Sequence, residues 1–202
     1  MQEKVVIKIL QEKLKFSKNS IDKLKLFSQK LIIANQSYNF ISKSTENDLW
    51  GRHILDSAQL VKFIDFNSES LSDIGTGGGF PGIVLALFNQ NEDFHVKLYE
   101  KSPVKREFLN KVVAELDIKA IVKSNIFDHM LDTDVIVCRA FKKLDQVIQV
   151  SREIAKKSHK LIILKGQNAQ EEINKTFKKY KYPYKLEKSM TNNDSKIFIA
   201  DF

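Results

Sequence analysis

The sequence predicts an α/β fold in which a doubly wound, mostly parallel sheet of seven strands follows an N-terminal helical extension. From about residue 70, short apolar runs alternate with segments of helical periodicity, as in parallel strands joined by crossover helices. A glycine cluster follows the first of these runs, whereas residues 1–65 show helical periodicity alone. We therefore expect a helical extension over 1–65, packed on a sheet domain over 66–202.

The extension is expected to contain three helices. Apolar residues recur at helical spacing between Val5 and Leu14, and again between Leu24 and Ile32. A third helix is predicted from about Thr45 to Ile64, with an irregular segment, Tyr38–Ser42, before it.

The remainder of the chain is expected to form the seven strands and the helices between them. The predicted strands are Leu71–Ile74, Val96–Glu100, Ala120–Lys123, Val135–Cys138, Leu161–Lys165, Tyr184–Lys188 and Lys196–Ala200. Helices are predicted at about 81–89, 103–117, 142–157 and 168–180. The last two strands are separated only by a short polar segment, so we expect them to form an antiparallel hairpin at the sheet edge.

Composition excludes several classes of protein. The chain has 202 residues and one cysteine, Cys138, which excludes an intramolecular disulfide framework. Its longest apolar run, Ile83–Phe88, is too short to cross a membrane, and no secretory signal is visible at the N-terminus. The histidines have no metal-ligand spacing, so we expect no metal. We expect a cytoplasmic protein, with nothing that requires a dimer.

The positive charge is unevenly distributed. The net charge is +8, with +4 over residues 1–65, −3 over residues 66–140, +8 over residues 141–189 and −1 over residues 190–202. Such basic flanks favour a polyanionic partner such as nucleic acid. Lysine supplies most of this charge, however, and a lysine-rich sequence is also compatible with a simple solvated surface.

The glycine cluster is the most informative local feature. Five of the seven glycines lie in the segment Asp73–Gly82, between the first strand and the first sheet helix. Glycines there permit positive φ angles and a close approach of the backbone to a ligand. The spacing of Gly77, Gly79 and Gly82 formally matches a dinucleotide fingerprint, but that of Gly75, Gly77 and Gly79 is equally regular.

Two carboxylates help to distinguish the possible cofactors. Asp73 precedes the first glycine, where its charge would repel a pyrophosphate but would favour the positively charged amino-acid end of S-adenosylmethionine. Glu100 ends the second strand, where it can accept hydrogen bonds from the hydroxyls of a ribose. The residues therefore favour S-adenosylmethionine over NAD.

Five further residues are candidates for the site. Arg139 and Lys165 end the fourth and fifth strands, so both are expected at the crevice, where they would position a substrate. Arg139 is alternatively an ion-pair partner in the fold. Arg52, His53 and Asp56 lie on the third predicted helix, where His53 and Asp56 can meet on one face. These three either dock the helix against the glycine loop or contact RNA.

Several segments together resemble a known family. They are Arg52–Ser57, Asp73–Ile83, Tyr38-Asn39, Lys105-Arg106 with Phe108-Leu109, Arg139-Ala140-Phe141 and Leu164-Lys165-Gly166. In this order they resemble the glucose-inhibited division protein B family, the guanine-N7 methyltransferases of small-subunit ribosomal RNA. The resemblance covers about residues 20–200 and implies a class I S-adenosylmethionine-dependent methyltransferase fold.

The resemblance also implies a substrate and cofactor contacts. The acceptor would be N7 of a guanosine in the decoding-centre loop of 16S ribosomal RNA, in the RNA or in the small subunit. The cofactor contacts would fall on Gly75, Phe80, Ile126, Phe127 and Arg139, with Glu100 at the ribose. Guanine N7 has an in-plane lone pair and no proton, so its methylation requires no general base.

Three alternatives stay open. A nicotinamide-dependent oxidoreductase would bind NAD on the same glycine loop. A non-catalytic RNA-binding protein would keep the fold without affinity for S-adenosylmethionine. A small-molecule methyltransferase would use the same cofactor, although the basic flanks count against it.

Overall fold

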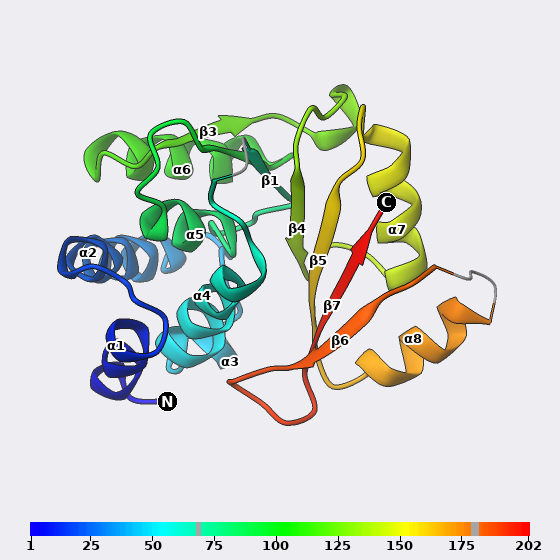
Figure 1. Cartoon of the computed structure of the whole chain (residues 1–202). Coiled ribbons are helices and arrows are strands. Elements are labelled where there is room, and N and C mark those ends of the chain that lie inside the picture. The colour runs from blue at the N-terminus through cyan, green and yellow to red at the C-terminus, as the bar shows by residue number, and fades with distance from the viewer. Residues whose placement is uncertain (68–69, 179–181) are drawn as a thin grey trace.

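The computed structural model describes residues 1–67, 70–178 and 182–202. Its centre is a single seven-stranded sheet with helices on both faces (Figure 1). The strands are β1 (Ser70–Ile74), β2 (His95–Tyr99), β3 (Ala120–Lys123), β4 (Val135–Arg139), β5 (Lys160–Lys165), β6 (Lys185–Lys188) and β7 (Lys196–Asp201). The predicted seven-stranded sheet is therefore confirmed.

The strand order is β3-β2-β1-β4-β5-β7-β6. The first five strands in this order are parallel, and β7 runs antiparallel between β5 and β6. The predicted hairpin of the last two strands is confirmed, with β6 at the sheet edge. The order reverses between β1 and β4, and in such sheets a ligand crevice opens at this point, beyond the carboxyl ends of the strands.

Helices connect and cover the strands. The extension contains α1 (Glu3–Glu12), α2 (Lys18–Asn35), α3 (Lys43–Glu46) and α4 (Asp56–Ala58), and the sheet domain contains α5 (Gly82–Phe88), α6 (Pro103–Glu115), α7 (Leu144–Ile154) and α8 (Ala169–Phe177). Two short 3-10 segments are η2 (Gln59–Phe63) and η3 (Ile126–Asp128). The predicted continuation of α8 over 179–180 falls outside the described residues.

The predicted helix from about Thr45 to Ile64 is confirmed only in part. A turn at residues 47–48 separates α3 from a continuous helical run over residues 49–63, in which a π-helix, η1 (Trp50–Leu55), is followed directly by α4 and then by η2. Packing requires a glycine at position 51 of this segment, because a Cβ atom there would lie 2.4 Å from Asp48 Oδ1 and 3.0 Å from Met1 Cβ. The wider π turn lies beside the crevice, in keeping with the frequent occurrence of such turns at functional sites.

Two apolar clusters hold the layers together. The larger joins the helices of the extension to α5, α6 and one face of the sheet, and includes Leu10, Phe27 and Leu98. The smaller joins α7 and α8 to the opposite face and includes Ile148 and Phe198. In Figure 1 the helices α1 to α6 accordingly lie on one side of β4 and β5, and α7 and α8 on the other. The extension therefore shares its core with the sheet.

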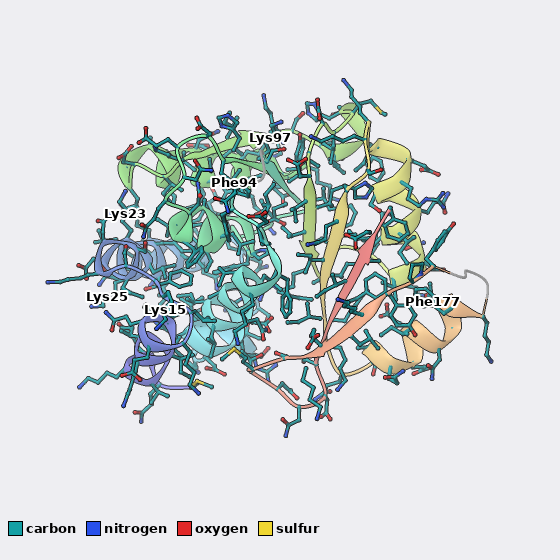
Figure 2. The ribbon with its side chains drawn as sticks, viewed as in Figure 1. Lys15, Lys23, Lys25, Phe94, Lys97 and Phe177 are labelled. Atoms are coloured by element: carbon teal, nitrogen blue, oxygen red, sulfur yellow. The ribbon has the colours of Figure 1, made fainter. Side chains whose placement is uncertain are left out.

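The polar side chains cover the outside of these layers. Figure 2 shows Lys15, Lys23 and Lys25 around α1 and α2, whereas Phe94 lies inside the packed layers. The Lys23 ammonium donates to the Asp117 carbonyl oxygen at 2.8 Å, which ties α2 to the end of α6. Within the described parts of the chain, the helices are too short or too polar to cross a membrane.

Phe27 offers a test of the shared core. Its side chain is fully buried and its ring centroid lies 5.4 Å from that of Phe80 in the glycine loop. We expect Phe27→Ala to lower the free energy of unfolding by about 3–5 kcal/mol, because it leaves a cavity between α2 and the sheet. Urea unfolding followed by circular dichroism measures this change.

The matched control is Ile33→Ala on the same helix, where the side chain is 66% exposed. We expect this substitution to change the free energy of unfolding by no more than about 0.5 kcal/mol. Equal effects of the two substitutions would contradict a core shared by α2 and the sheet.

Candidate functional site

Three residues with a left-handed backbone conformation give the glycine loop its shape. Gly75, Gly77 and Gly79 have φ angles of +74°, +60° and +102°, which residues with a Cβ atom rarely adopt. A Cβ atom on Gly77 would meet only the Gly75 carbonyl oxygen, at 4.0 Å, so this glycine faces open space. On Gly79 it would lie 2.8 Å from Ile83, so Gly79 is required for packing behind the loop.

Asp73 lies beneath the loop. Its fully buried carboxylate accepts a hydrogen bond from the Gly82 amide at 2.7 Å and so fixes the start of α5. Burial raises the pKa of Asp73 to about 7. The sequence predicts a cofactor contact for both Asp73 and Gly79, for Asp73 either directly or through water. Neither residue is among those that line the cleft above the loop.

The first cleft lies above the loop, at the carboxyl ends of β1 to β4, and has a volume of about 670 Å³. It brings together most of the residues that the sequence singles out: Arg52, His53, Gly75, Gly77, Phe80, Glu100, Ile126, Phe127 and Arg139. Phe40, Ile41 and Thr45 of the extension close one side. The sequence alone predicts no role for these three residues, because only the fold brings them to the cleft.

Glu100 is held in a fixed orientation at the end of β2. Its Oε2 accepts from the Gly77 amide at 3.0 Å and its Oε1 from the Ser102 amide at 2.8 Å. The residue is 8% exposed and lines the first cleft. A carboxylate oxygen has more than one acceptor site, so both oxygens retain the capacity to bind hydroxyl groups.

Residues 140–142, directly after β4, close the first cleft, and the sequence alone predicts no individual role for them. Lys142 Nζ lies 5.7 Å from the Phe127 ring centroid and 5.9 Å from that of Phe141. Phe141 also covers the loop, since a Cβ atom on Gly75 would lie 2.5 Å from its Cδ2. Ala140 has a φ of +50°, a strained conformation that is typical of functional sites. The only sequence signal for this segment was its match to the family pattern.

Arg139 connects the end of β4 to the π-helix. Its Nη1 donates to the Arg52 carbonyl oxygen at 2.9 Å and its Nη2 to His53 Nδ1 at 2.6 Å. The guanidinium carbon lies 5.1 Å from the Phe80 ring centroid. The Asp56 carboxylate is 3.9 Å away. Arg139 is therefore both a cleft residue and a structural link.

His53 is neutral, with a defined tautomer. A guanidinium only donates, so His53 Nδ1 must accept from Arg139 and the ring proton must be on Nε2. That nitrogen lies 2.9 Å from Thr45 Oγ1 and donates to it. Burial, followed by the charges of Arg139 and Arg52, lowers the pKa of His53 to about 3. Both ring nitrogens are thus engaged.

Asp56 serves a different partner from the one expected. The sequence places it where it can meet His53 on one helix face, but its Oδ1 accepts instead from Thr191 Oγ1 and Gln59 Nε2, each at 2.9 Å. Its Oδ2 faces Arg139. Asp56 thus anchors the loop between β6 and β7 to the π-helix region, a contact across more than a hundred residues of sequence.

A second cleft of about 670 Å³ lies beside the first. The two share one wall, formed by Arg52, Arg139, Ala140, Phe141 and Lys142. The other lining residues include Asp48, Asp56, Lys143, Lys165, Glu172, Thr191 and Asn192. Lys165 thus lines the second cleft, and the first cleft lies across the shared wall. In the described ranges, no group of three His, Cys, Asp or Glu residues is placed to hold a metal ion.

The carboxylates of the second cleft all have partners. Glu172 binds Lys165 Nζ at 2.7 Å, and Asp48 binds the N-terminal amine. Asp56 is engaged by Thr191 and Gln59. The cleft therefore presents no unpaired carboxylate among the residues that the structure describes.

Comparison with known proteins identifies the family. A family model described as GidB, rRNA small subunit methyltransferase G, matches residues 20–197. The chain belongs to this family. Proteins named ribosomal RNA small subunit methyltransferase G in Pelagibacter ubique and Rickettsia akari are 36% and 34% identical over 176 and 183 residues. These alignments cover 84% and 90% of this chain, and 83% and 93% of the relatives.

Solved structures agree with the methyltransferase fold of the GidB family. A putative O-methyltransferase from Klebsiella pneumoniae superposes with a TM-score of 0.63 over 98% of this chain and 96% of that chain, at 9% identity. A mutant of MtNAS in complex with S-adenosylmethionine has a TM-score of 0.57 over 99% and 84%, at 14% identity. The expected class I methyltransferase fold is confirmed.

The His53 assignment makes a measurable prediction. We expect the ¹⁵N chemical shifts of its ring to stay constant between pH 5 and 8, because the pKa of His53 is about 3. The unfolded chain has the ordinary pKa near 6.5, so His53 contributes stability above pH 6.5 that is lost as the pH falls towards 3.

The matched variant is Arg139→Gln, which removes the positive charge next to Nδ1. In this variant we expect the His53 ring to titrate at a higher pH than in the wild-type protein. A wild-type ring that titrates near pH 6.5 would overturn the assigned hydrogen bonds.

Proposed function

We propose that this protein transfers the methyl group of S-adenosylmethionine to N7 of a guanosine in the decoding-centre loop of 16S ribosomal RNA, as RNA or within the small subunit. Membership of the GidB family supports methylation of small-subunit ribosomal RNA. Each carboxylate in the described part of the second cleft is held by internal partners, and this arrangement suits an acceptor such as N7, which has no proton to remove and needs no general base.

The first cleft fits S-adenosylmethionine. Gly77 leaves open space where a side chain would otherwise project, so a ligand can approach the backbone. Glu100 presents two oriented oxygens that suit the hydroxyls of a ribose. Ile126 and the exposed Phe127 supply apolar surface for an aromatic base. Gly75, Phe80 and Arg139 complete the proposed binding set.

S-adenosylmethionine, when bound, supplies an electrophilic methyl group. The task of the protein is then to orient the acceptor and exclude water, and orientation alone can contribute roughly 7–11 kcal/mol to the rate enhancement. Arg139 is a positioning residue in this scheme. It holds the π-helix against Phe80 and forms part of the wall that the two clefts share.

His53 is poorly placed to act as a base. Its Nδ1 accepts from Arg139 and its Nε2 donates to Thr45, so neither nitrogen has a free lone pair. Its lowered pKa also makes it a weak proton acceptor. These observations favour an acceptor atom that reacts through an existing lone pair.

The division of the chain follows from the same proposal. Residues 1–65 form the extension and 66–202 the methyltransferase domain, and the extension contributes Arg52 and His53 to the site. We propose that the protein acts as a monomer in the cytoplasm, where its proposed substrate is found. Membership of the family favours this function over an NAD-dependent oxidoreductase or a non-catalytic RNA-binding protein.

The cofactor assignment is tested by Gly77→Asp. The new side chain would occupy the space above the loop, strain a residue with a φ of +60° and repel the Glu100 carboxylate. We expect binding of S-adenosylmethionine to be lost in isothermal titration calorimetry.

Gly166→Ala is the matched control, because a Cβ atom at Gly166 meets nothing within 4 Å. We expect the affinity of that variant to stay within about twofold of wild type. Unchanged affinity of Gly77→Asp, in a folded protein, would disprove the placement of the cofactor.

The reaction itself is tested with labelled S-adenosylmethionine and small subunits that lack the modification. We expect label in 7-methylguanosine after digestion of the 16S RNA and mass spectrometry of its nucleosides. Label in another nucleoside would overturn the acceptor atom. Binding of the cofactor without any transfer to this RNA would overturn the substrate.

A further inference from the structure

We propose that the second cleft holds the substrate RNA strand through phosphate contacts from Arg52, Lys142 and Lys143, and that Lys165 makes no such contact. The inference rests on the proposed function, because it takes RNA as the acceptor. The sequence alone does not distinguish these four basic residues, whereas their partners in the structure do.

The three proposed contacts share two properties. Arg52, Lys142 and Lys143 are all exposed and line the second cleft. Among the described residues, none of them forms a salt bridge with a carboxylate. They come from two different elements, the π-helix and the segment between β4 and α7, and so present positive charge on adjoining parts of the cleft.

The other cations of this cleft are already neutralised. Lys165 Nζ binds Glu172 at 2.7 Å and donates to the Lys142 carbonyl oxygen at 3.0 Å, and its side chain is only 10% exposed. Arg139 is engaged by His53, the Arg52 carbonyl and Asp56. A phosphate near Lys165 would therefore have to compete with an existing internal ion pair.

The position of the cleft suits an acceptor strand. It shares the wall from Arg139 to Lys142 with the cleft proposed for the cofactor, so a base beside this wall would be next to the methyl donor. The loop between β6 and β7 forms another side, where Thr191 is held by Asp56 at 2.9 Å. One side of the second cleft is therefore the loop anchored by Asp56, and another side carries the positive charges that have no carboxylate partner.

RNA phosphates fit this charge arrangement. Each phosphate neutralised by a lysine or arginine releases condensed counterions, so binding weakens with salt in proportion to the number of contacts. An internally paired lysine releases none when RNA binds. The salt dependence of binding therefore distinguishes Lys165 from the three proposed contacts.

The test measures the affinity of an unmodified 16S RNA transcript over a series of KCl concentrations. We expect Arg52→Gln, Lys142→Gln and Lys143→Gln each to weaken binding several-fold and to reduce the salt slope by about 0.7–0.9. Lys165→Gln should leave the salt slope unchanged and lower Tm instead, because Glu172 loses its cationic partner and keeps only the hydrogen bond from the Leu144 amide.

Lys156→Gln is the matched control. This lysine is exposed and lies shortly before β5, near the amino end of that strand, whereas the clefts lie at the carboxyl ends of the strands. We expect this variant to bind the RNA with the affinity and the salt dependence of the wild-type protein. The proposal is overturned if Lys156→Gln weakens binding as much as the three cleft variants, or if Lys165→Gln alone reduces the slope.

Two further readouts separate this proposal from the proposed function. Calorimetry with S-adenosylmethionine should give wild-type affinity for the Lys143 variant, which changes a residue outside the first cleft. If the wild-type protein binds the transcript with the expected slopes but methylates no small-subunit RNA, the proposed function fails while the phosphate assignments stand.

Discussion

The site depends above all on the hydrogen bonds of Arg139. This single guanidinium joins the end of β4 to the π-helix through the Arg52 carbonyl and His53, and lies over Phe80 of the glycine loop. Burying a guanidinium is costly unless its donors are satisfied. The arrangement meets this requirement with neutral acceptors and with Asp56 at 3.9 Å. The neutral state of His53 and the wall between the two clefts both follow from it.

A second constraint acts beneath the glycine loop. Asp73 binds the Gly82 amide from inside the fold, while Glu100 binds the Gly77 amide from the cleft side. The loop is therefore held by one carboxylate on each side, at positions where backbone amides have no strand partner. Binding surface is thus prepared before any ligand arrives, which reduces the ordering cost of association.

The extension completes the site and does not merely adjoin it. Asn35 at the end of α2 accepts hydrogen bonds from the amides of Phe40 and Ile41 and donates to Glu46. These contacts fold the irregular segment after α2 over the first cleft. Because α2 also packs against the sheet through the shared core, the cofactor loop and the extension are stabilised together.

The sequence by itself determined the sheet, the glycine loop and most residues of the first cleft, because strand periodicity, glycine clustering and strand ends are local signals. It also predicted Glu100 at the crevice, since a strand end fixes where a side chain emerges. Only the tertiary structure placed Asp73 beneath the loop, interrupted the predicted helix after Thr45, and paired Asp56 with Thr191 and Lys165 with Glu172. Those outcomes depend on contacts between segments far apart in the chain, where periodicity carries no information about which partner a charge or hydroxyl will meet.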